Sequence, residues 1–204
     1  MTAELPSGDP KLVQIVDAAL ADTARRSGEW LVCKLGCTQC CIGVFAINQL
    51  DVARLQRGIA DLQISDPPRA ARIRQRALAS IESLRPDFPG SPETGILEES
   101  VEVTERFEEF ANDEPCPVLD PVTGACDLYS HRPILCRTFG PPMRTEDGNL
   151  AACELCYTHA TTAQIAACEL DPAIPALEQA SDQAFNAAHH LHGETLVACA
   201  LRAK

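Results

Sequence analysis

Eleven cysteines among 204 residues constrain this chain more than any other feature, and nine of them fall in two blocks. The first block places four thiols within nine residues: Cys33, Cys37, Cys40 and Cys41. The second block is longer and contains Cys116, Cys126, Cys136, Cys153 and Cys156. Thiolates are soft, charged ligands that hold zinc or iron–sulfur clusters, and a Cys-x2-Cys spacing lets one turn of chain bind one metal through two sulfurs. The pattern predicts metal binding.

A disulfide framework is the competing interpretation, and the composition disfavours it. Disulfides belong to oxidising compartments and mostly to small domains that lack a sufficient core. The first residues show no basic segment followed by an apolar one, and no apolar stretch is long enough to span a bilayer. A chain that is 46% hydrophobic can bury a core without disulfides, and an odd number of cysteines leaves one over. We expect a cytoplasmic protein that binds metal, with unmetallated buried or redox-active thiols as a third alternative.

The charge balance disfavours a nucleic-acid partner. The formal net charge is −12, from 29 acidic and 17 basic residues, whereas binding through phosphates needs a basic surface. One local basic cluster exists, and we interpret it as a solvated helix face: Arg69, Arg72, Arg74 and Arg76. The charge balance does not argue against a protein partner.

Apolar residues at helical spacing flank the cysteine blocks. Asn48 is expected to cap one of the helices, with Asp51 reaching back toward it. The predicted helices cover Lys11–Arg26, the segment from Asn48 to about Leu62, Pro68–Leu84, Glu98–Asn112 and Ala176–His192.

The second cysteine block is interrupted by prolines and glycines, which predicts irregular structure. We expect short extended pieces at Cys126–Tyr129 and Cys136–Phe139, and no regular helix until after Cys153. The predicted fold is mainly α: a single helical domain over residues 1–204, wrapped around an irregular, metal-bound cysteine-rich centre with little or no β. The cysteine core would cover about 33–156, and a C-terminal helical segment about 158–204.

Particular stretches of the two blocks carry a family resemblance. They are Cys37-x2-Cys40-Cys41, then Cys116-Pro117-x-Leu119, Gly124-Ala125-Cys126, and Tyr129 followed by Arg132-Pro133-x-x-Cys136-Arg137. Together they resemble the CxxCxxCC zinc- or iron-chelating domain family (YkgJ-like cysteine-cluster proteins) over roughly Cys33 to Cys156. Cys33 departs from the family pattern, because three residues rather than two separate it from Cys37. The resemblance implies metal chelation, without implying a reaction.

The ligand set has alternatives at this point. Cys37-x2-Cys40 and Cys153-x2-Cys156 have the spacing of zinc-binding pairs. Cys40 and Cys41 would project differently from an extended backbone, so we expect them to serve different metals or different corners of a cluster, unless Cys41 only packs. Both a tetrahedral zinc and an iron–sulfur cluster accept four thiolates, and the all-cysteine set slightly favours the cluster.

Residues outside this ligand set have structural interpretations. Cys168 and Cys199 lie in apolar helical sequence, which is typical of core residues. We expect Arg132 and Arg137 to make structural hydrogen bonds or ion pairs, and Tyr129 to be a packed aromatic.

Two functions follow for the predicted metal centre. The first is an iron–sulfur protein for redox or electron-transfer work, and the alternative is a structural zinc module that mediates protein–protein interaction. Recognised nucleophile and phosphate-binding motifs are absent from the sequence, so the question of an enzyme stays open.

Overall fold

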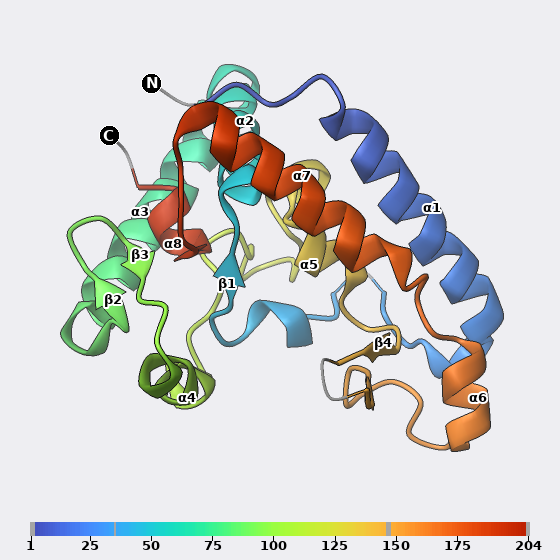
Figure 1. Ribbon diagram of the computed structural model, residues 1–204. Coiled ribbons are helices and arrows are strands. Elements are labelled where there is room, and N and C mark those ends of the chain that lie inside the picture. The colour runs from blue at the N-terminus through green and yellow to red at the C-terminus, as the bar shows by residue number, and fades with distance from the viewer. Residues whose placement is uncertain (1–2, 35, 146–147, 203–204) are drawn as a thin grey trace. The chain divides into compact units, whose positions relative to one another are not determined.

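A computed structural model describes residues 3–34, 36–145 and 148–202, and this part of the chain divides into two compact units. The first unit contains residues 3–5, 36–133 and 184–202, and the second contains residues 6–34 and 134–183. Figure 1 shows the elements of both units along the chain. The single domain expected from the sequence stays a prediction.

Helices dominate the described residues, which confirms the mainly α prediction. The eight α-helices are α1 (Asp9–Ser27), α2 (Gln49–Ser65), α3 (Pro67–Leu84), α4 (Val101–Glu109), α5 (Ile134–Thr138), α6 (Thr162–Ala167), α7 (Ala173–His189) and α8 (Val197–Ala200). Four 3-10 turns accompany them: η1 (Gly28–Trp30), η2 (Gln39–Cys41), η3 (Arg85–Asp87) and η4 (Tyr129–His131). The strands are two residues long: β1 (Ala46–Ile47), β2 (Gly90–Ser91), β3 (Ile96–Leu97), β4 (Met143–Arg144), β5 (Leu150–Ala151) and β6 (Thr195–Leu196).

Side-chain caps explain where the long helices of the first unit begin. The Asn48 side chain accepts a hydrogen bond of 2.8 Å from the Asp51 amide, as the sequence predicts for the start of α2. Asp66 accepts in the same way from the Arg69 amide and begins α3, with prolines in its first turn. Ser100 caps α4.

The core of the first unit lies among α2, α3 and α8. Buried residues of these helices, such as Leu55, Ile73 and Ala200, form one apolar cluster with Val118 and Leu128 of the second cysteine block. A small antiparallel sheet in the order β1-β6-β3-β2 adds to this unit. The cysteine-bearing segment is therefore packed into the core.

The second unit brings together α1, α5, α6 and the hairpin of β4 and β5. The Arg137 guanidinium on α5 donates hydrogen bonds of 2.9 and 3.0 Å to the Asp17 carboxylate on α1. This ion pair confirms the structural role expected for Arg137.

Two sequence predictions of local structure are wrong. Cys136 lies on the short helix α5, where an extended piece was expected, because Pro133 precedes five residues that contain neither proline nor glycine. α4 covers Val101–Glu109 only, and Phe110 leaves helical geometry at its end. The acidic helix is therefore shorter than the predicted Glu98–Asn112.

Candidate metal centre

Cys40 and Cys41 lie on the 3-10 turn η2 in the first unit. The Cys41 amide donates to the Thr38 carbonyl at 2.8 Å, which closes the turn. The two sulfur atoms are 4.0 Å apart. The sequence prediction that Cys40 and Cys41 project in different directions assumed an extended backbone. This assumption is wrong, because the backbone here forms a turn.

Backbone hydrogen bonds join the Cys40–Cys41 turn to the second cysteine block. The Cys116 amide donates to the Cys41 carbonyl at 2.8 Å, and Ile42 forms a β-bridge with Pro115. Cys126 forms an antiparallel bridge with Leu119, and the Leu119 amide donates to the Cys116 carbonyl. These contacts place three cysteine-bearing segments side by side within one unit.

An arginine of α3 links two segments of the second cysteine block. Arg76 donates to the Pro117 carbonyl at 2.8 Å and to the Asp127 carboxylate at 2.6 Å. Arg69 donates to the other oxygen of Asp127, also at 2.6 Å. The Asp127 side chain is only 2% exposed, so this is a buried carboxylate neutralised by two cations. Each contacted residue follows a cysteine directly, and Arg76 therefore links the backbone at Cys116 to that at Cys126.

Sequence reasoning missed this clamp. It treated the α3 arginines as a solvated face, whereas two of them bind Asp127. The signal that pointed to it was the aspartate directly after Cys126, in a segment otherwise rich in small and apolar residues.

The thiols of the first unit have unequal proton affinities. The hydrogen bond between the Cys40 and Cys41 sulfurs lowers the pKa of Cys40 to about 6, and the nearby Arg132 guanidinium acts in the same direction. The same hydrogen bond raises the pKa of Cys41. Burial raises the pKa of Cys116 to about 12 and also raises that of Cys126. At neutral pH in the metal-free protein, Cys40 is therefore expected to be a thiolate, and Cys41, Cys116 and Cys126 are expected to be thiols.

Arg132 contributes more than hydrogen bonds to the loop. Its guanidinium carbon lies 3.9 Å from the centre of the Tyr129 ring. Its charge helps to lower the pKa of Cys40, and it opposes the larger effect of burial, which raises the pKa of Cys126. Tyr129 itself is 58% exposed, so the expected packed aromatic is wrong.

Cys37 belongs to the same unit and is half-buried. Gly124, in the loop before Cys126, has a φ of +67°, and a Cβ atom there would lie 3.4 Å from the Gly36 Cα. The loop that leads to Cys126 thus packs against the residue before Cys37.

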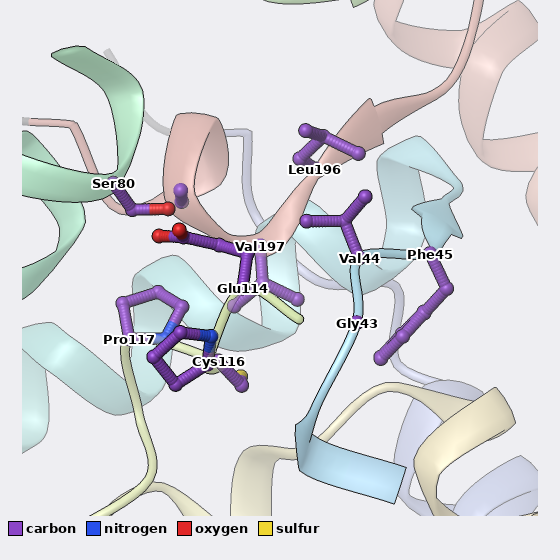
Figure 2. A pocket seen from close by; sticks show the side chains of 11 residues that line it. Gly43, Val44, Phe45, Ser80, Glu114, Cys116, Pro117, Leu196 and Val197 are labelled. Carbon is purple, nitrogen blue, oxygen red and sulfur yellow. The ribbon is translucent and has the colours of Figure 1, made fainter. Parts of the chain in front are cut away.

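Cys116 also lines a small cavity of about 20 Å³. Figure 2 shows its side chain and Pro117 from one segment, with Gly43 and Val44 from another. Ser80, on α3, contributes a buried hydroxyl oxygen that has no hydrogen-bond partner. The cavity is about as large as one water molecule requires.

The second unit contains the other predicted ligands. Cys33 is exposed and Cys136 on α5 is half-buried, whereas Cys153 and Cys156 are 7% and 5% exposed. The Cys156 amide donates to the Cys153 carbonyl at 2.8 Å, so this Cys-x2-Cys pair forms a tight turn. The pair packs with Tyr157 and Cys168 in an apolar cluster.

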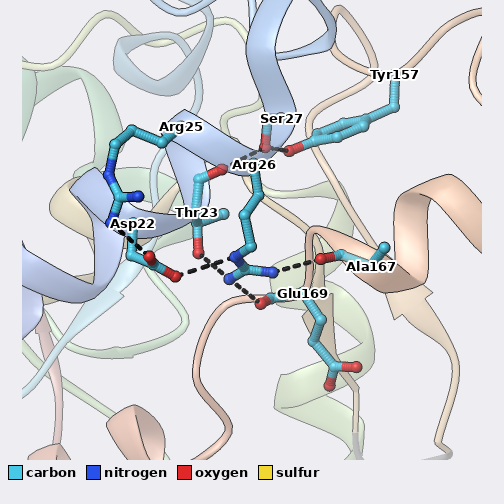
Figure 3. Close-up of polar contacts among 8 residues, drawn as sticks. All are labelled: Asp22, Thr23, Arg25, Arg26, Ser27, Tyr157, Ala167 and Glu169. Atoms are coloured by element: carbon cyan, nitrogen blue, oxygen red, sulfur yellow. Dashed lines mark hydrogen bonds and ion pairs between the residues drawn. The ribbon is translucent and has the colours of Figure 1, made fainter.

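Polar contacts fix this turn to the end of α1. The Tyr157 hydroxyl lies 2.5 Å from the Ser27 hydroxyl, and the Tyr157 amide donates to the Trp30 carbonyl at 3.0 Å. Arg26 donates to the carbonyls of Ala167 and Glu169, on either side of Cys168 (Figure 3). Tyr157 has a φ of +59°, a left-handed conformation that surrounding contacts must maintain. Cys168 is 1% exposed, in agreement with the core position expected from the sequence.

The cysteine sulfurs are suitable donors for a soft metal, and the distance between the Cys40 and Cys41 sulfurs also fits one. Two sulfurs on one tetrahedral zinc, each at about 2.3 Å from the metal, are about 3.8 Å apart, close to the 4.0 Å between Cys40 and Cys41. Within residues 3–34, 36–145 and 148–202, however, no three His, Cys, Asp or Glu side chains already converge on a metal position. Binding therefore requires the other thiols to rotate toward this pair. In the same part of the chain, no helix is both long and apolar enough to cross a membrane.

A protein-family model matches more than half of the chain. The model of the CxxCxxCC family, described as "Putative zinc- or iron-chelating domain", matches residues 32–174. The chain belongs to this family, which confirms the resemblance inferred from the cysteine motifs. No curated protein and no solved structure shows significant similarity to the chain.

Proposed function

We propose that this member of the zinc- or iron-chelating family binds one metal ion through Cys40, Cys41, Cys116 and Cys126, and that the ion is zinc in a structural role. The observation that carries the proposal is the 4.0 Å separation of the Cys40 and Cys41 sulfurs on a closed turn. In a [4Fe–4S] cluster each cysteine binds a different iron, so two sulfurs this close suit a centre in which one metal ion binds both, as in a single-zinc site.

The backbone supports the same four ligands. The Cys116 amide donates to the Cys41 carbonyl, and Cys126 is bridged to Leu119, whose own amide donates to the Cys116 carbonyl. Because these segments join the apolar core of the first unit, a metal held between them would stabilise irregular chain that has few helical hydrogen bonds of its own. Five further cysteines stay candidate ligands: Cys33, Cys37, Cys136, Cys153 and Cys156.

Cobalt substitution is the sharpest test of this coordination. Apo protein loaded with Co²⁺ should show the strong visible and sulfur-to-metal charge-transfer bands of a tetrahedral thiolate site. Zinc should displace the cobalt stoichiometrically. Weak bands typical of octahedral oxygen ligands would contradict the proposal.

A second candidate is an iron–sulfur cluster with a redox function in the cytoplasm. The position of Arg132 favours it, because this arginine acts electrostatically on both Cys40 and Cys126 and would offset the negative charge of a thiolate-ligated cluster. Anaerobic purification separates the candidates. A brown protein with iron and acid-labile sulfide supports the cluster, whereas a colourless protein with stoichiometric zinc supports the zinc centre.

A further inference from the structure

The first unit has a large groove beside α4. Its volume is about 580 Å³, and its walls come from α4, the segment after β3, Ala46 of β1 and Glu194 before β6. The Leu97 amide donates to the Glu194 carbonyl at 2.9 Å, so backbone pairing within the small sheet fixes one wall.

The floor of this groove is apolar and its rim is acidic. Leu97, Val103 and Phe107 line it with half-buried side chains. The charged residues that line it are all glutamates: Glu98, Glu99, Glu105 and Glu194. All four are exposed, and among the lining residues there is no lysine or arginine.

One apolar lining residue is exposed. Val101, in the first turn of α4, lines the groove and is 72% exposed. An apolar contact in a complex would bury it.

We propose that this groove docks a basic, amphipathic segment of a partner protein. The floor would take apolar side chains, and the glutamate rim would pair with lysine or arginine beside them. An anionic partner is disfavoured, because nucleic acid or an acidic membrane surface would meet only carboxylates here. The groove residues are separate from the cysteines, so the proposal does not depend on the metal centre.

The probe for this groove is a fluorescein-labelled peptide of leucine and lysine with leucines at helical spacing, titrated with the metal-loaded chain of 204 residues. The double variant Glu99→Gln/Glu105→Gln should weaken binding about tenfold, because it removes two ion pairs at the acidic rim. Val101→Ser should weaken binding about fivefold through lost apolar contact. Added salt should reduce the loss of affinity caused by the glutamate substitutions, and it should leave the loss caused by Val101→Ser unchanged.

A matched control separates the groove from overall charge. Glu82→Gln/Glu93→Gln changes the net charge equally at exposed sites of the same unit that do not line the groove, and it should change affinity by less than twofold. Metal content and circular dichroism of each variant report folding independently of peptide binding. Loss of metal binding in the wild type would overturn the proposed function and leave this proposal intact.

Two results would overturn the docking proposal. One is equal weakening by the control pair and the groove pair, which would show attraction to the acidic protein as a whole. The other is equally tight binding of a peptide with serine in place of leucine, which would show that the apolar floor takes no part.

Discussion

In the first unit, Cys40 and Cys41 lie half-buried on a closed turn, and the charge of Arg132 acts on Cys40. In the second unit, Cys156 and Cys168 are almost fully buried against the ring of Tyr157. The first environment shifts the proton affinities of its thiols, whereas the second uses sulfur largely as an apolar packing group. Cysteine count alone therefore does not distinguish a ligand from a core residue, and the surroundings of each thiol do.

Replacing one cysteine by serine in each unit should give the largest difference in metal binding between the two units. We expect Cys116→Ser to lower metal affinity, because a hydroxyl is a poor ligand for a soft metal. The loss should exceed the roughly 10–100-fold that follows when a residue supporting a ligand is removed, since here the ligand itself is lost. Cys168→Ser should keep its metal but lose about 1–3 kcal/mol of stability, because it buries a hydroxyl among apolar groups. Metal-to-protein ratios and urea unfolding measure the two effects. Full metal occupancy in Cys116→Ser would contradict the proposed ligand set.

The pH dependence of metal affinity should follow the shifted thiols. Metal binding needs thiolates, so affinity must fall as pH falls and protons compete for the sulfurs. Near pH 7, Cys40, with a pKa of about 6, is already ionised, while Cys41, Cys116 and Cys126 still hold protons. We expect about three protons to be released per metal ion.

Competition titrations with a chelator of known pH dependence measure this number. Ordinary thiols, with a pKa of about 8.5, would finish titrating at about pH 10.5, and the slope of affinity against pH would then vanish. Here the slope should persist above that pH, because the pKa of Cys116 is raised to about 12. A slope that has already disappeared at about pH 10.5 would show that these thiols are not the ligands.

The sequence predicted the helices of the fold well and the cysteine geometry poorly. Asn48 predicted the start of α2, because its side chain forms a local hydrogen bond with the Asp51 amide and such contacts span only a few residues. The turn at Cys40 and Cys41 depends instead on pairing with residues near Cys116. The clamp between Arg76 and Asp127 joins residues 51 positions apart. No local pattern fixes such contacts, because the whole unit must fold before they form.

Removing the clamp should weaken metal binding without removing a ligand. We expect Arg76→Met to lower metal affinity about tenfold, because the segments of Cys116 and Cys126 lose their shared partner. Arg72→Met, at an exposed position of the same helix, is the control and should leave affinity unchanged. Equal affinities of the two variants would show that the clamp serves stability alone.

The smallest expected effect belongs to the hydroxyl of Tyr157 in the second unit. Tyr157→Phe removes the hydrogen bond with Ser27, but the Ser27 hydroxyl still donates to the Thr23 carbonyl at 2.7 Å. No buried donor is therefore left without an acceptor, and the free energy of unfolding should fall by only about 0.5–1.5 kcal/mol. Tyr129→Phe is the matched control, since its hydroxyl belongs to a ring that is 58% exposed, and it should be neutral. Both variants should keep full metal content. If Tyr157→Phe instead loses metal, the buried cysteines of the second unit take part in chelation, and the contrast between the two units fails.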